Sequence, residues 1–192
     1  MDNKQRYDQF YRSFVIPQRE RSQSELKLLL EQEEETIVAG FESMLLDLVQ
    51  QVYSYQQENQ EKIWCACECA VLLSSVLSTG KPIVAEAFGE GWYSDIIASS
   101  WGELDLFFNY WQKLRQEAQD EAKRYMGYIH RETADRDMLG WLMLNISMLF
   151  PYFEKAVNRV VQTEEYEKCI SHARLTFHFG IYRSVNEKCS IG

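Results

Sequence analysis

Three cysteines at alternate positions, Cys65, Cys67 and Cys69, are the first residues whose type and spacing suggest chemistry. On the helix expected here, Cys65 and Cys69 lie on one face and Cys67 on the other. Cys169 and His172 have the i,i+3 spacing that could complete a two-helix zinc site with Cys65 and Cys69. The Cys-x₂-Cys pairs typical of structural zinc are absent, and free cysteine is usually buried. The sequence therefore favours structural thiols and predicts no metal.

Pairs of acidic residues at helical spacing form a second set. They are Glu31 with Glu34, Glu58 with Glu61, and Glu117 with Asp120. Such pairs hold Mg²⁺ in all-α nucleotide pyrophosphatases, but that family's order of a Glu pair followed by a Glu–Asp pair on adjacent helices is not reproduced. In a chain with 29 acidic residues these spacings arise by chance, and a solvated surface explains them. A divalent-metal nucleotide hydrolase is thus the weakest functional hypothesis.

The remaining motifs contain no catalytic constellation. His130, His172 and His178 form neither a Glu-x-x-His nor a His-Glu-x-x-His pattern. The stretch 89–94 has two glycines of the dinucleotide fingerprint but lacks the third and follows no predicted strand, so it predicts a turn. The sequence has no Gly-x-Ser-x-Gly elbow and no phosphate-binding loop. It therefore predicts no catalytic residue and no cofactor.

The segment 80–103 is the best candidate for a binding surface. It carries two tryptophans between strongly periodic segments, where a simple connector would need none. Together with a helix expected over 135–161, it supplies the predicted ligand-binding or partner-binding residues, Trp92, Tyr93, Asp95, Trp101 and Asn145. The alternative is that the two tryptophans form a packed plug at one end of a bundle.

The element expected to position these side chains is a helix over 135–161. It is apolar nearly all round from Met138 to Phe153, so it must be surrounded by protein or lipid. The run is shorter than the roughly 20 residues of a membrane span and contains Asn145 and Pro151, which favours burial in protein. Pro151 predicts a kink just before it. We therefore expect an all-α, single-domain bundle of about six to eight helices around this central helix.

Helical periodicity predicts the other elements of the bundle. Helices are expected over 2–15, 22–52, 62–78, 103–129 and 163–181, with an irregular segment over 79–102. Pro17 is expected to end the first helix, and Ser22 with Glu25 to cap the second. Only Leu175–Ile181 gives a weak hint of strand-like alternation. One domain is expected over 1–192, with 1–17 as an N-terminal appendage and 184–192 as a frayed tail.

Composition and charge exclude several classes of protein. The 192 residues are 46% hydrophobic and 26% charged, which is typical of a globular chain that needs no metal or disulfide to fold. A net charge of −9 argues against a nucleic-acid partner. The first residues lack an apolar signal-peptide core, and the five cysteines have no framework spacing, so we expect a cytoplasmic location.

The leading functional hypothesis is a non-catalytic helical protein that binds an unknown protein partner or itself, for example as a homodimer. Five tryptophans and eleven tyrosines support it, because aromatic residues are enriched at interfaces. The alternative is a helical pocket protein that binds a small molecule, with or without chemistry. Neither a nucleic acid nor a membrane is expected as a partner.

Overall fold

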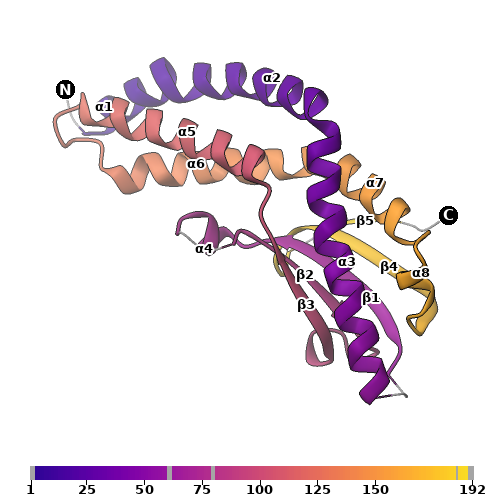
Figure 1. Ribbon diagram of the computed structural model, residues 1–192. Helices are drawn as coiled ribbons and strands as arrows, with labels where there is room; N and C mark the ends of the chain where they lie inside the picture. Colours follow the sequence, from indigo (N-terminus) through magenta and orange to yellow (C-terminus); the bar gives the residue numbers. More distant parts are fainter. Residues whose placement is uncertain (1–2, 60–61, 79–80, 185, 190–192) are drawn as a thin grey trace. The chain divides into compact units, whose positions relative to one another are not determined.

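The fold is a mixed α/β arrangement, so the prediction of an all-α helical bundle is wrong. A computed structural model describes residues 3–59, 62–78, 81–184 and 186–189. It contains a five-stranded sheet with the strand order β3-β2-β1-β4-β5 (Figure 1). Among the described residues, no helix is long and apolar enough to cross a lipid bilayer.

The chain divides into two compact units by its internal contacts. The first comprises Met1–Glu33 and Asp105–Asn145, and the second comprises Glu34–Leu104 and Ile146–Gly192. The single domain expected over 1–192 stays a prediction.

The second unit holds the whole sheet. Its elements are α3 (Glu34–Glu58), β1 (Trp64–Val71), α4 (Leu73–Val76), β2 (Ile83–Phe88), η2 (Trp92–Ser94), β3 (Ile96–Gly102), η3 (Ile146–Leu149), α7 (Phe150–Val160), α8 (Glu164–Glu167), β4 (Ser171–Ile181) and β5 (Glu187–Cys189). β1 runs antiparallel to β2 and parallel to β4, while β2 with β3 and β4 with β5 are antiparallel. The sheet is therefore mixed.

One face of this sheet packs against α3 and α7. Phe41 of α3, Phe153 of α7 and Phe179 of β4 contact one another, with ring centroids 5.3 to 5.5 Å apart. Cys69 of β1 is the register partner of Phe179, and neighbouring partners share a face. Cys67 and Cys69 therefore point toward the helices, and the residues between them point to the opposite face.

The helix predicted over 62–78 and the irregular segment over 79–102 are instead strands of this sheet. All of β2 is buried, and so is β1 apart from Cys65. A strand buried on both faces shows no alternation of apolar and polar residues. A short apolar run of this kind cannot be distinguished from a buried helix by periodicity. The helix predicted over 163–181 is reduced to the single turn of α8, followed by β4.

The central helix predicted over 135–161 is not one helix. α6 (Arg131–Asn145) belongs to the first unit and α7 to the second, with the 3₁₀ turn η3 between them in the sequence. Pro151 lies in the first turn of α7, where its missing N–H costs no intrahelical bond. The kink predicted before Pro151 is thus present as a break in the helix, and no single helix forms the axis of a bundle.

The first unit contains α1 (Asn3–Phe10), the π-helical turn η1 (Tyr11–Val15), α2 (Ile16–Gln32), α5 (Asp105–Lys123) and α6. Pro17 does not end the first helix as predicted, because it follows the wider π turn and occupies the first turn of α2. Ser22 is not the predicted cap, since it lies inside α2 and donates a 3.2 Å hydrogen bond to the Arg19 carbonyl.

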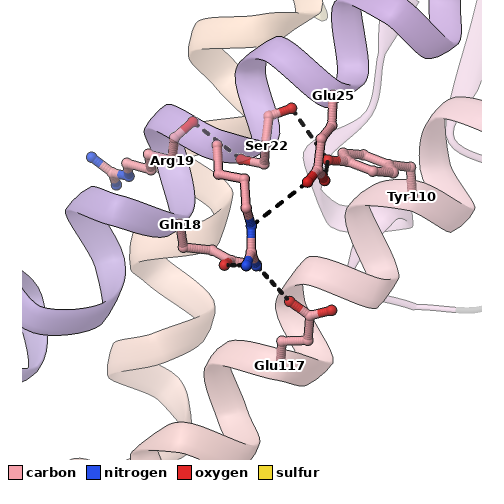
Figure 2. Close-up of polar contacts among 7 residues, drawn as sticks. Gln18, Arg19, Ser22, Glu25, Tyr110 and Glu117 are labelled. Atoms are coloured by element: carbon pink, nitrogen blue, oxygen red, sulfur yellow. Dashed lines mark hydrogen bonds and ion pairs between the residues drawn. The ribbon is translucent and has the colours of Figure 1, made fainter.

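Polar side chains connect α2 to α5 within the first unit. Gln18 donates a 2.6 Å hydrogen bond to Glu117, and Tyr110 donates a 2.9 Å bond to Glu25 (Figure 2). The guanidinium nitrogens of Arg21 lie 3.7 Å from the carboxylate of Glu25 and 3.7 Å from that of Glu117. Burial and the hydrogen bond to Glu25 raise the pKa of Tyr110, so its hydroxyl remains a donor. The network fixes the side-by-side packing of the two helices.

The end of the chain is not only a frayed tail. Within the stretch 184–192, β5 pairs with β4 through Cys189, Lys188 and Glu187. Residues 185 and 190–192 lie outside the described part of the structure.

Candidate functional site

Glu68 and Glu86 lie side by side on the sheet face opposite α3 and α7. They are register partners on β1 and β2, and Glu68 stands between the helix-facing Cys67 and Cys69. Only 2% of Glu68 and 8% of Glu86 is exposed. Two adjacent buried carboxylates are unfavourable unless they are protonated or paired with donors. This glutamate pair is therefore the main candidate for a functional site.

Glu68 accepts hydrogen bonds from two turns. Tyr93 of the β2–β3 turn donates its hydroxyl to Oε2 at 2.6 Å, and Asn186 of the β4–β5 turn donates its amide to Oε1. Burial and the hydrogen bond to Glu68 raise the pKa of Tyr93 to about 12, so the phenol stays protonated near neutral pH. Both turns are thus connected to one buried carboxylate.

Glu86 is less well paired than Glu68. Its Oε2 is buried and has no hydrogen-bond partner among the described residues. Burial and the charge of Glu68 raise the pKa of Glu86, and the opposing effects of a hydrogen bond from Tyr182 and the charge of Arg183 do not cancel this rise. A bound proton therefore stabilises the glutamate pair, and a cationic hydrogen-bond donor could take the place of that proton.

Aromatic rings border the glutamate pair. Trp92 stacks on Phe88 at 5.3 Å and meets His178 edge-on at 5.5 Å. His178 is the register partner of Glu68 on β4. Burial and the charge of Lys188 lower the pKa of His178 against the opposite effect of Glu68, which favours the neutral imidazole near neutral pH.

Both turns have unusual backbone conformations. Trp92 and Arg183 have φ angles of 52° and 56°, in the left-handed region that side-chain-bearing residues rarely adopt. A Cβ added to Gly89 would overlap the Asp95 carboxylate, and one added to Gly180 would overlap the Asn186 amide. Backbone strain of this kind concentrates at binding and switch sites.

Replacing Gly180 with alanine is expected to displace Asn186 from Glu68. The new Cβ would lie 3.2 Å from the Asn186 Cα, so backbone as well as side chain must move. Urea unfolding should show a loss of about 1–3 kcal/mol. The control is Gly140→Ala in α6, where the nearest atom is Arg19 Nη2 at 3.6 Å and the change should be neutral or stabilising. Equal effects of the two substitutions would contradict the close approach.

Three of the five predicted binding residues lie in or next to the β2–β3 turn. Trp92 and Tyr93 form part of it, and Asp95 ends it with a 2.7 Å ion pair to Lys62. Trp101 lies further along β3 and is 50% exposed, so it is not a packed plug. The structure therefore places Trp92 and Tyr93 at the glutamate pair, while Asp95 stabilises the turn.

Asn145 belongs to the first unit and ends α6. It is buried, and its amide donates a 2.8 Å hydrogen bond to the Trp141 carbonyl. Its contacts are those of a buried helix end. Glu68, Glu86 and Asn186 were not among the residues predicted from the sequence. The available signal for the first two was a single carboxylate inside an apolar run, because glutamate is rarely buried without a partner.

The cysteines are all unpaired in the structure. Strand β1 places Cys67 and Cys69 on the same face, not on opposite faces as the predicted helix required. Burial raises the pKa of both thiols strongly, which keeps them protonated. The described residues contain no group of three or more His, Cys, Asp or Glu side chains that could hold a metal ion. That the cysteines act as structural thiols stays a prediction.

Two residues of the acidic pairs considered for Mg²⁺ form ion pairs with lysine. Glu34 forms a 2.6 Å ion pair with Lys155, and Asp120 forms one of the same length with Lys123. Glu61 lies outside the described residues.

Comparisons with known proteins do not assign the chain to a family. No protein-family model matches the sequence, and neither curated proteins nor solved structures gave a significant match. The function is therefore inferred from the residues of the site.

Proposed function

We propose that the protein binds a small molecule with a protonated amine at the glutamate pair. The observation that carries this proposal is the buried Oε2 of Glu86, which accepts no hydrogen bond from the described residues. An ammonium group can donate three hydrogen bonds, and its charge offsets that of Glu68 and Glu86. This is the small-molecule alternative considered from the sequence, with a sheet in place of a helical pocket.

The neighbouring rings suit the same chemistry. Cations bind favourably over the faces of aromatic side chains. The guanidinium of Arg183 already lies 5.6 Å from the centre of the Tyr93 ring and 5.2 Å from that of Tyr182. A resident cation beside the glutamate pair supports a cationic ligand, which would displace Arg183 or lie next to it.

The β2–β3 turn is the element that would admit the ligand. Tyr93 is 37% exposed, whereas its hydrogen-bond partner Glu68 is almost completely buried. Rotation of Tyr93 away from Glu68 would uncover the carboxylates. The left-handed φ of Trp92 supports a turn with a second, less strained conformation.

Amine binding is expected to release protons. The pKa of Glu86 is raised in the free protein, and a bound cation favours its ionised form. Affinity should therefore increase as the pH rises through the ionisation of Glu86. Isothermal titration calorimetry with n-butylamine in two buffers of different ionisation heat measures the protons released. Butyramide, which has a similar size and no charge, is the matched control.

Glu86→Gln separates ligand binding from a purely structural pair. It removes the charge and keeps the shape, so affinity for n-butylamine should fall by about tenfold or more, equivalent to about 1.4 kcal/mol. When folding raises the pKa of a carboxyl, the folded protein loses stability as the pH rises through that pKa. Glutamine does not ionise, so the variant does not lose stability in this way. The variant should therefore melt higher near neutral pH. If it melts higher but n-butylamine binds both proteins equally, or neither, the proposal is wrong and the pair only shares a proton.

A further inference from the structure

We infer that β3 is a docking edge to which an extended, basic segment of a partner protein adds as a further strand, next to α3. The inference does not depend on the amine site. β3 is the last strand on its side of the described sheet, so one row of its backbone groups lies outside the ladder. Strand addition to such an edge is a recurring mode of peptide recognition, with main-chain hydrogen bonds supplying affinity.

The two edges of the sheet differ in their protection. β5 is three residues long and carries Glu187 and Lys188, and short charged edges resist further pairing. β3 is seven residues long, has no charged residue, and exposes 43% of Ile96 and 50% of Trp101. Of the two edges formed by the described strands, that of β3 is therefore the more open to an added strand.

A groove of about 490 Å³ lies between this edge and α3. Its α3 wall is a stripe of polar residues at helical spacing, Asp47, Gln50, Gln51, Ser54, Tyr55 and Glu58. Its β3 wall is Ile97 and Ala98, which both line the groove because the register with β2 shifts at this point. Alternate side chains of an added strand would face the stripe on α3.

The charge of the groove indicates the chemistry of the partner. Asp47 and Glu58 are acidic, and none of the described residues that line the groove is lysine, arginine or histidine. The Asp47 carboxylate is held in place by a 2.6 Å hydrogen bond from Ser100 of β3. Lysine or arginine at alternate positions of the segment would therefore meet a fixed negative charge.

A second copy of this chain fits the edge less well than a basic segment. Antiparallel pairing of two β3 strands would bring the polar stripes of two copies together, each with Asp47 and Glu58. Each copy also has a net charge of −9, which opposes association. The partner is therefore a different protein, with a basic segment in extended conformation.

Fluorescence anisotropy of the full chain with a labelled peptide of about ten residues, alternating Lys and Val, tests this inference. We expect saturable binding that weakens with salt. Ser54→Lys, within the groove, should weaken binding about tenfold. Gln57→Lys, which adds the same charge to α3 outside the groove, should leave binding nearly unchanged. Both positions are exposed and lysine is a good helix former, so both variants should fold.

A second set of peptides tests strand addition itself. In an added strand, the N–H groups of alternate residues face β3, and those of the residues between them face away. N-methylation of the first set removes the backbone donors to β3 and should weaken binding at least tenfold relative to N-methylation of the second set. The inference would be overturned if peptides N-methylated in the two registers bound equally well. It would also be overturned if a Glu-Val peptide bound as tightly as the Lys-Val peptide, or if the Lys-Val peptide bound Ser54→Lys and Gln57→Lys equally. A dimer of the free protein, measured by light scattering, that Ser54→Lys dissociates would overturn it as well, because the edge would then bind a second copy.

Discussion

Replacing Phe179 with alanine is expected to lower the free energy of unfolding by about 3–5 kcal/mol. The side chain is 1% exposed and contacts the rings of Phe41 and Phe153, at centroid distances of 5.5 and 5.3 Å. It therefore joins β4 to both helices that cover the sheet. Removing the ring leaves a cavity, because the two helices and the strand around it cannot move inward to fill it. Urea unfolding followed by far-ultraviolet circular dichroism measures the loss.

Two controls define what the Phe179 result means. Phe179→Leu keeps most of the volume and should cost about 1–1.5 kcal/mol. His178→Ala removes a half-buried ring from the opposite face of the same strand and should cost less than Phe179→Ala. If His178→Ala were the more damaging change, the assignment of the two faces of β4 would be wrong.

Replacing Arg115 with alanine is expected to cost about 3 kcal/mol. Arg115 binds Asp135 through two hydrogen bonds of 2.8 and 3.0 Å, and the two side chains are only 14% and 19% exposed. Without Arg115, the Asp135 carboxylate keeps a hydrogen bond from Gln119 and a distant contact of 3.9 Å with Arg131. A largely buried charge would thus lose its main partner.

The loss caused by Arg115→Ala should become smaller in acid. Burial opposes ionisation of Asp135, but the hydrogen bonds from Arg115 and Gln119 outweigh it and hold the pKa of Asp135 below its usual value. A carboxyl with a pKa lowered by folding stabilises the protein above its unfolded pKa of about 3.9 and loses that contribution as the pH falls through the folded pKa. The two proteins should therefore differ fully near neutral pH and converge in acid.

Lys123→Ala is the matched control for Arg115→Ala. Lys123 forms an ion pair of 2.6 Å with Asp120 on the same helix, but the two side chains are 73% and 57% exposed. Exposed pairs contribute between about 0 and 1 kcal/mol. Equal losses from the two substitutions, or a difference that does not change with pH, would contradict the role of the buried pair.

Short-range features of the chain could be predicted from the sequence because they depend on neighbouring residues. The helix predicted over 103–129 is present as α5 (Asp105–Lys123), with Phe107, Trp111 and Leu114 in the core. Thr163 caps α8 by accepting a hydrogen bond from the Tyr166 N–H, a contact within one helical turn. The helix break before Pro151 also follows from local chemistry, since proline lacks the N–H that a continuous helix needs. Periodicity, capping and proline each act within a few residues.

The sheet was decided only by tertiary structure. The apolar residues of β1 suit a buried helix and a buried strand equally well. They form a strand because β2 and β4 supply hydrogen-bond partners on both sides, and these partners are distant in the sequence. The weak alternation over Leu175–Ile181 was the only local sign of this arrangement. It is present in the sequence because one face of β4 is less buried than the other.

The candidate site combines both kinds of information. The sequence by itself identified the β2–β3 turn, through Trp92 and Tyr93 in a segment rich in glycine. It gave no sign that Glu68 would lie beside Glu86, or that Asn186 would reach Glu68 from another turn. Those contacts depend on strand register, and a shift of one residue would move each glutamate to the helix-covered face. Register is set by the packing of the whole sheet, so the tertiary structure alone brings the carboxylates together.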